Sequence, residues 1–224
     1  MNRKLNSCCI LLVSILVISC GGNNDKNDKL PVLGRKKIIE RFEGGKTFFD
    51  TLEHKIADFS FLNQDSAIVT NDNYEGKIYI ADFFFTSCPT ICPTMKKQML
   101  RVYEGFEGND KIAILSHTID PEYDNVMVLR DYAERLGVSS SKWNFVTGDL
   151  DEIYDLGEKS YMVTAGEDEE APGGYIHSGA FLLVDMNRRI RGIYDGTIPE
   201  DVDVLMNDIG RLLMEYEGAG LSEK

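Results

Sequence analysis

Two runs of almost uninterrupted apolar residues lie in the middle of the chain. Residues 77–85 read KIYIADFFF, and residues 111–119 read KIAILSHTI. Short apolar runs rich in isoleucine and aromatic residues are typical of strands that are buried on both faces. A third run at 143–148, WNFVTG, predicts a shorter strand that ends in a turn.

Apolar residues at helical spacing separate these strands. They recur at every third or fourth position over residues 95–106 and again over 126–136. For the second of these helices Asp124 is a candidate N-cap, and Gly137 lies just past the expected end. A third amphipathic pattern at 202–216 predicts a helix near the C-terminus.

Hairpins complete the pattern. Residues 176–185 and 189–196 predict a late hairpin, and short apolar runs mixed with turn residues at 47–70 predict hairpin strands ahead of the first buried strand. The order is strand, helix, strand, helix, strand, hairpin, helix. This alternation favours an α/β domain whose mostly parallel sheet is covered by helices, with an antiparallel edge from the late hairpin. Reactive groups in such sheets lie at the carboxyl ends of strands.

The N-terminus has the features of a targeting segment. Two basic residues precede an apolar run at 9–18 that is too short to cross a membrane comfortably. The run ends in VISC, which resembles the bacterial lipobox. That resemblance implies that residues 1–19 are a lipoprotein signal peptide and that the Cys20 thiol carries lipid; an uncleaved membrane anchor is the alternative. Either way we expect an extracytoplasmic domain in a bacterial cell envelope, held at the membrane.

Composition supports one folded domain behind a tether. Residues 20–35 are polar and rich in glycine, which predicts a flexible tether, and residues 36–224 have the size of a single domain. The net charge of −13 disfavours nucleic acid as a partner. The same charge suits a basic partner, although it also simply favours solubility.

Five cysteines reduce to one reactive pair. Cys8 and Cys9 would leave with the signal peptide and Cys20 would be capped by lipid, so Cys88 and Cys92 remain, in the stretch SCPTICP. The pair has three interpretations: a redox couple, part of a metal site or a structural disulfide. A disulfide here would close almost no loop and would therefore add little stability.

The chemistry expected of the pair follows from its place before a helix. Pro93 disfavours helical geometry at Cys92, so we expect the regular helix to begin near Pro93, with both cysteines on the bend that leads into it. A helix N-terminus favours negative charge, and both thiols should therefore ionise more readily than free cysteine. Two thiolates favour Cu(I) over hard cations, and no second cysteine pair or HxxxH motif completes a zinc site.

Three histidines are candidates for a further ligand. We expect His54, at the polar end of a hairpin, on the surface, and His117, inside a buried strand, to be a hydrogen-bonded strand residue. His177 starts a predicted strand after the acidic, glycine-containing loop EDEEAPGGY. A loop able to move and ending in an imidazole would suit a lid over two cysteines, but a structural role for His177 stays open on this pattern.

Several segments together resemble one protein family. DFSFLNQDSAIVT, ADFFFTSCPTICPTM, SHTIDPEYD, WNFVTG and IHSGAFLLVD occur in the order and spacing of the SCO/SenC family, over about residues 47–215. These are thioredoxin-fold copper proteins that serve assembly of respiratory cytochrome oxidase. The resemblance implies a thioredoxin-like α/β fold, a central mixed sheet flanked by helices with an N-terminal β-hairpin added. It also implies copper ligation by Cys88, Cys92 and His177, and it maps the family's Asp-Pro-x-x-Asp segment onto residues 120–124.

The function implied is that of a copper metallochaperone rather than an enzyme. We expect one copper ion per chain, Cu(I) in preference to Cu(II), delivered to the CuA centre of an oxidase subunit or exchanged with another copper chaperone. The alternatives are a thiol–disulfide reductase that keeps the oxidase cysteines reduced, or a redox or copper sensor. The CxxxC spacing favours metal, because dithiol oxidoreductases of this fold usually carry CxxC.

Asp82 favours the redox alternative. It interrupts an apolar strand six residues before Cys88, and a buried aspartate needs a partner or a raised pKa. Thioredoxin is similar, with a buried aspartate six residues before its first active-site cysteine that helps to move protons to and from the thiols. The other interpretation of Asp82 is a carboxylate hydrogen-bonded to backbone or to a neighbouring lysine.

Overall fold

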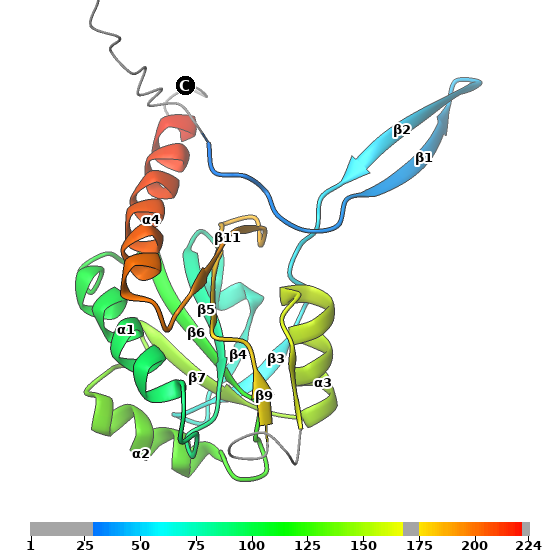
Figure 1. Cartoon of the computed structure of the whole chain (residues 1–224). Helices are drawn as coiled ribbons and strands as arrows, with labels where there is room; N and C mark the ends of the chain where they lie inside the picture. The colour runs from blue at the N-terminus through cyan, green and yellow to red at the C-terminus, as the bar shows by residue number, and fades with distance from the viewer. Residues whose placement is uncertain (1–28, 168–174, 221–224) are drawn as a thin grey trace, which may run out of the picture.

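A mixed seven-stranded sheet forms the centre of the protein (Figure 1). The computed structural model describes residues 29–167 and 175–220. The strand order is β11-β10-β5-β6-β7-β3-β4, and only β5, β6 and β7 run parallel to one another. The strands are β3 (Ser60–Asn63), β4 (Ile68–Thr70), β5 (Ile78–Phe84), β6 (Ile112–Thr118), β7 (Trp143–Thr147), β10 (Ala180–Val184) and β11 (Ile190–Asp195). The buried strands and the late hairpin are confirmed, but antiparallel neighbours on both sides make the sheet mixed rather than mostly parallel.

Helices cover both faces of this sheet (Figure 1). One face carries α1 (Cys92–Gly105), α2 (Val126–Leu136) and α4 (Pro199–Gly220). The other carries α3 (Leu150–Asp155), which continues into a π-helical turn at Leu156–Tyr161. We did not predict α3, because six residues are too few to show a helical period. Within the described ranges no helix has the length and apolar character needed to span a membrane.

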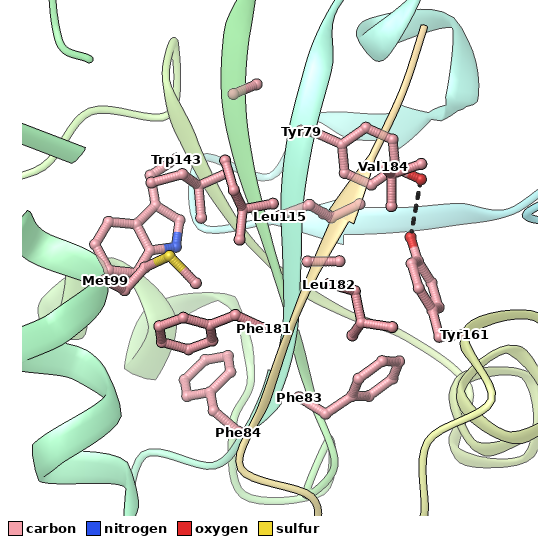
Figure 2. Packing of buried hydrophobic residues seen from close by; sticks show 14 of the residues in the cluster. Tyr79, Phe83, Phe84, Met99, Leu115, Trp143, Tyr161, Phe181, Leu182 and Val184 are labelled. Carbon is pink, nitrogen blue, oxygen red and sulfur yellow. Dashed lines mark hydrogen bonds between the residues drawn. The ribbon is translucent and has the colours of Figure 1, made fainter. Parts of the chain in front are cut away.

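Alternation along β5 divides the core into two layers. Phe84 points toward the helices α1 and α2, where the Tyr132 ring stacks on it at 5.5 Å between centroids. Phe83 points to the opposite face and meets the edge of Tyr161 at 5.5 Å. Figure 2 shows both groups, with the hydroxyls of Tyr79 and Tyr161 joined by a 3.1 Å hydrogen bond. Because side chains alternate along a strand, Asp82 shares the α1 face with Phe84.

The folded body begins earlier than its composition indicates. The backbone N–H of Leu30 donates to Glu215 on α4 (2.7 Å), and its carbonyl accepts from the Arg191 guanidinium on β11 (2.6 Å). Arg191 is itself buried and pairs with Asp185 and Glu215. The chain is thus attached to the domain from residue 30 rather than from the expected boundary at 36.

An N-terminal hairpin stands apart from the central sheet. It consists of β1 (Lys37–Glu43) and β2 (Lys46–Leu52), which pair only with each other and project away from the body (Figure 1). Gly44 and Gly45 close it with φ angles of 60° and 78°. Two successive positive φ angles are typical of a type I′ turn, and glycine adopts them without steric cost. The predicted N-terminal hairpin is confirmed, although its first strand lies ahead of the segment 47–70.

Candidate metal centre

The two cysteines lie at the carboxyl end of the central strand. β5 ends at Phe84, Cys88 lies in the following loop, and Cys92 is the first residue of α1. Pro93 is tolerated in the first helical turn, where its missing N–H would have no partner within the helix. Both cysteines are buried, with 8% of Cys88 and 5% of Cys92 exposed.

The environment of the pair shifts the pKa values of the two thiols in opposite directions. Burial alone would raise the pKa of Cys88, but the backbone N–H groups of Thr90 and Cys92 and the Cys92 thiol donate to its sulfur, and that pKa is lowered. Burial raises the pKa of Cys92 well above its ordinary range, against one N–H from Phe85, and the charge of Cys88 raises it further. Cys88 is therefore the more acidic of the two thiols, and Cys92 holds its proton more tightly. The expectation that both would ionise readily is wrong for Cys92, because desolvation outweighs the helix N-terminus.

The arrangement of the sulfurs fits a soft cation. The Cys92 thiol donates to the Cys88 sulfur, so the two sulfurs are within hydrogen-bonding distance of each other. Loss of the Cys92 proton would leave two adjacent thiolates, which bind thiophilic metals such as Cu(I) or zinc. Among the residues that the structure describes, no group of three histidine, cysteine or acidic side chains is placed to hold a metal. The side chain of His177 lies outside the described part, so its role as third ligand stays a prediction.

The backbone of His177 belongs to a small separate sheet. β8 (Ala165–Glu167) pairs antiparallel with β9 (Tyr175–His177), and His177 lies opposite Ala165. His177 is thus the last residue of β9, and β10 begins only at Ala180. The prediction that His177 starts the following long strand is wrong, because residues 178 and 179 separate β9 from β10 and belong to neither strand.

Contacts on both sides of His177 bring this segment to the cysteine loop. The ring of Tyr175 lies 5.1 Å from that of Phe85, between centroids. On the other side of the histidine, a Cβ built on Gly179 would lie 3.8 Å from Cδ1 of Ile91. Phe85 and Ile91 flank the loop that carries Cys88, so the chain around His177 runs beside that loop.

The other two histidines have structural environments. His54 is half-buried rather than on the surface, and its Nε2 atom lies 2.6 Å from the carbonyl of Ser160. His117 is fully buried, and neither ring nitrogen has a hydrogen-bond partner among the described residues. The predicted hydrogen bond of His117 is therefore wrong. Its ring stacks on Phe83 at 4.8 Å, and burial lowers the pKa of His117 to about 3, which keeps the imidazole neutral.

Asp82 has both a hydrogen-bond partner and a raised pKa, as expected of a buried carboxylate. It accepts a hydrogen bond from the Ser116 hydroxyl, whose oxygen in turn accepts from the indole N–H of Trp143 (2.8 Å). Burial raises the pKa of Asp82 to about 7, although the bond from Ser116 opposes the shift. The negative charge of Asp82 also raises the pKa of Cys92. The partner is a serine hydroxyl rather than backbone or lysine.

A second buried carboxylate, Asp124, fixes the start of the cysteine loop. It accepts the backbone N–H of Thr86 (3.0 Å) and the hydroxyls of Thr86 and Thr118, the latter at 2.6 Å. Thr86 lies two residues before Cys88. The helix α2 is capped by Asn125 instead, so the prediction of Asp124 as its N-cap is wrong. Asp124 belongs to the Asp-Pro-x-x-Asp segment of the family resemblance, which singled this residue out. Hydrophobic periodicity alone does not show that it holds the cysteine loop.

The comparison with known families decides the identity of the fold. Residues 50–214 match the SCO1/SenC family. The chain belongs to that family. The thioredoxin-like α/β fold that the resemblance implied is therefore confirmed.

Three solved structures of the family are similar to this chain. A SCO1/SenC family lipoprotein from Bacillus anthracis is 27% identical, with 71% of this chain and 95% of that one covered and a TM-score of 0.66. BsSco, described as a member of the Sco family of cytochrome c oxidase assembly proteins and as having a disulfide switch, is 29% identical over 72% and 94% of the two chains, with a TM-score of 0.62. Arabidopsis thaliana ScoI with copper bound is 27% identical over 71% and 98%, with a TM-score of 0.60. The family thus includes copper-binding proteins and oxidase assembly proteins.

The raised pKa of Asp82 predicts a pH-dependent stability. The folded-state value of about 7 lies above the ordinary 3.8, so the folded protein binds this proton more tightly than the unfolded chain. The corresponding stabilisation is present below about pH 4 and is lost as the pH rises to about 7. Relative to Asp82→Asn, wild type should therefore lose up to about 4 kcal/mol of unfolding free energy across that range. Urea unfolding at a series of pH values measures this difference.

Asp131→Asn is the matched control for this experiment. Asp131 lies on α2 with 66% of its side chain exposed, so its replacement should leave the pH profile of wild type unchanged. Parallel profiles for wild type and Asp82→Asn would show that Asp82 does not take up this proton on folding.

Proposed function

We propose that this protein is a copper metallochaperone, which binds one copper ion through Cys88, Cys92 and His177 and delivers it to the CuA centre of a respiratory cytochrome c oxidase. The observation that carries the proposal is the pair of adjacent buried sulfurs on the loop that leads into α1, one of which, that of Cys88, has a lowered pKa. Membership of a family with copper-bound and oxidase-assembly members supports it. Two thiolates favour Cu(I), while a histidine nitrogen also accommodates Cu(II).

The proton on Cys92 couples copper binding to the buried carboxylate. Cys92 is the thiol of the pair, so its use as a ligand requires loss of that proton. Asp82 interacts electrostatically with Cys92 and has a pKa of about 7, which suits a group that takes up a proton and passes it on. The bond from Ser116 holds the carboxylate in place in either state.

The position of His177 suits a ligand that can be exchanged. It lies on β9, a three-residue strand whose only partner in the described sheet is the three-residue β8. Displacing so short a strand breaks few backbone hydrogen bonds. A ligand from a recipient protein would then be able to replace the imidazole while Cys88 and Cys92 stay in place between β5 and α1.

A surface beside the loop offers a place for the recipient. A hollow of about 370 Å³ adjoins Thr86 and Ser87 of the cysteine loop, and its other wall is formed by α2 and the turn before it. Met127 and Tyr123 line this hollow and are 77% and 57% exposed. Exposed apolar side chains next to a transfer site favour contact with a protein partner, an oxidase subunit or another copper chaperone.

The protein is proposed to be attached to the membrane by lipid on Cys20, after removal of residues 1–19, on the extracytoplasmic side of a bacterial envelope. The lipobox-like VISC motif supports this, and so does the similarity to a family lipoprotein from Bacillus anthracis.

Thiol–disulfide reduction is a second candidate, favoured by the unequal thiols. The Cys88 thiolate would attack a substrate disulfide, forming a mixed disulfide and releasing one substrate thiolate, which takes a proton. Cys92, deprotonated by Asp82, would then attack the Cys88 sulfur, closing the Cys88–Cys92 disulfide and releasing the second substrate thiol. Two electrons pass to the substrate, and an external dithiol must restore the protein. A redox or copper sensor would use the same site.

Copper binding tests the three-ligand site. The domain without residues 1–20 should bind one Cu(I) per chain, and Cys88→Ser or Cys92→Ser should abolish tight binding without unfolding the domain, because the pair closes no long loop. His177→Ala should weaken binding more than tenfold, or about 1.4 kcal/mol, and His54→Ala should not. Competition with a Cu(I) chelator measures these affinities. Full affinity in Cys92→Ser, or normal copper binding and oxidase assembly with His177→Ala, would contradict the chaperone mechanism.

Reduction of a small disulfide separates the two candidates. If the thiols also act in redox exchange, Asp82→Asn should lower the rate at neutral pH by about tenfold or more, because it removes the proton acceptor. His177→Ala should stay within a few-fold of wild type in the same assay, since the imidazole has no role in exchange. An unchanged rate for Asp82→Asn in a stopped-flow thiol assay would remove Asp82 from the redox mechanism.

Processing of the N-terminus tests the lipid. Cys20→Ala should accumulate as a precursor that retains residues 1–19, because the modified cysteine is where the signal peptide is cut. Gel mobility and intact mass measure this, and the wild-type N-terminus should be an acylated Cys20. A variant with the mobility of wild type, together with no acyl group on wild type, would favour the uncleaved anchor.

A further inference from the structure

The N-terminal hairpin has two chemically different faces. Residues paired directly across an antiparallel sheet lie on the same face. One face carries Ile38, Phe42 and Phe49, together with Thr47, Thr51 and Glu40; the other carries Lys37, Arg41, Glu43, Lys46 and Asp50, with Ile39, Phe48 and Leu52. We call the first the apolar face and the second the charged face.

The apolar face is uncovered. Phe42 is 75% exposed, Ile38 is 69% exposed and Phe49 is 66% exposed. Glu40 is the single ionisable residue on this face. An isolated two-stranded sheet is marginally stable in water unless something packs on its apolar side. Three large exposed side chains on one face of a projecting element therefore indicate a binding partner for this face.

On the charged face, in contrast, several side chains interact with one another within the hairpin. Arg41 pairs with Glu43 and, at 3.1 Å, with Asp50. The Arg41 guanidinium also lies over the Phe48 ring, 5.2 Å from its centroid, and Phe48 is only 42% exposed. The partner therefore belongs on the face of Phe42 and Phe49 rather than on that of Phe48.

The base of the hairpin is attached to the body. Directly after β2, Glu53 pairs with Arg189 at 2.8 Å and His54 contacts the Ser160 carbonyl at 2.6 Å. Ahead of β1, Leu33 forms a backbone bridge to Ile190. Attachment on both sides sets the direction in which the hairpin projects, so it is a defined arm and not a continuation of the tether.

Chain length places the arm near the membrane. Cys20, the proposed lipid site, precedes Leu30, where the chain joins the domain, by ten residues. Ten residues span at most about 35 Å when fully extended, and a seven-residue strand is about 23 Å long. The arm lies at the same end of the molecule as the C-terminal end of α4, where Glu215 bonds the backbone of Leu30, and away from the end where β5 leads into α1 (Figure 1). A membrane that holds Cys20 is thus within reach of the arm while the cysteine pair faces away from it.

Charge also favours a lipid surface. Residues 35–52 contain five basic and three acidic residues, a local excess of two positive charges in a chain whose net charge is −13. Basic residues next to exposed phenylalanine and isoleucine are typical of segments that lie in the interface of a membrane with anionic headgroups.

We propose that the apolar face of the β1–β2 hairpin inserts into the surface of an anionic phospholipid membrane and orients the domain with its cysteine pair directed away from that membrane. The inference rests on membrane attachment through the N-terminus, by lipid or by an uncleaved anchor, and is independent of copper. Each inserted aromatic ring replaces contact with water by contact with acyl chains, which stabilises the docked orientation.

Two tryptophan variants one residue apart test the insertion. Phe49→Trp reports on the apolar face and Phe48→Trp on the charged face, and the natural Trp143 is buried in the core as a constant background. The full-length protein is reconstituted into vesicles of phosphatidylcholine and phosphatidylglycerol, with and without brominated acyl chains. Bromine quenching of Phe49→Trp fluorescence should exceed that of Phe48→Trp by about threefold or more, because only the first ring contacts the acyl chains.

Sedimentation with the vesicles, followed by intact mass, first shows that the reconstituted chain is membrane-bound and whether lipid or an anchor holds it. Failure of the lipid prediction is therefore visible separately, and copper binding is measured on the same sample. Equal quenching of the two variants, or none in either, would overturn the inference. Absent quenching together with a dimer cross-linked through the hairpin would show that a second copy covers the apolar face instead.

Discussion

Two sulfur atoms share a space at the end of β5 from which water is largely excluded, and this space does not stabilise two negative charges. Hydrogen bonds from Thr90 and from Cys92 stabilise one thiolate on Cys88. The second sulfur keeps its proton because its ionisation would place another anion in a desolvated site beside the first. A metal cation in place of that proton, or a covalent bond between the sulfurs, would also avoid two adjacent negative charges. The proposed copper binding and the alternative thiol redox chemistry would thus use the same electrostatic arrangement.

The surrounding fold maintains that arrangement through buried polar groups. Asp124 fixes Thr86 at the start of the loop, and Pro93 begins the helix at its end. Asp82 lies on the helix-facing side of β5, held by Ser116 and linked electrostatically to Cys92. A carboxylate with a pKa near neutrality costs stability, which is consistent with a functional position rather than a structural one.

The hairpin and the cysteine loop lie at opposite ends of the molecule. The hairpin and the attachment at Leu30 lie at one end, and the cysteine loop with β9 lies at the other (Figure 1). A protein held at a membrane and acting on a partner protein benefits from such polarity, because the reactive sulfurs are presented to the partner and not to the lipid. The rigid central sheet transmits this orientation, since β5 leads directly to the cysteines and β11 to the N-terminal attachment.

The sequence by itself determined the buried strands, the helices beside them and the CxxxC loop at the end of β5, because periodicity and proline act over a few neighbouring residues. It also predicted an aspartate in the core at position 82. Only the tertiary structure decided which thiol has the lower pKa, that the ring nitrogens of His117 have no hydrogen-bond partner among the described residues, and that Asp124 holds Thr86. Each of these depends on desolvation and on donors brought together from distant parts of the chain, for which local patterns carry no signal.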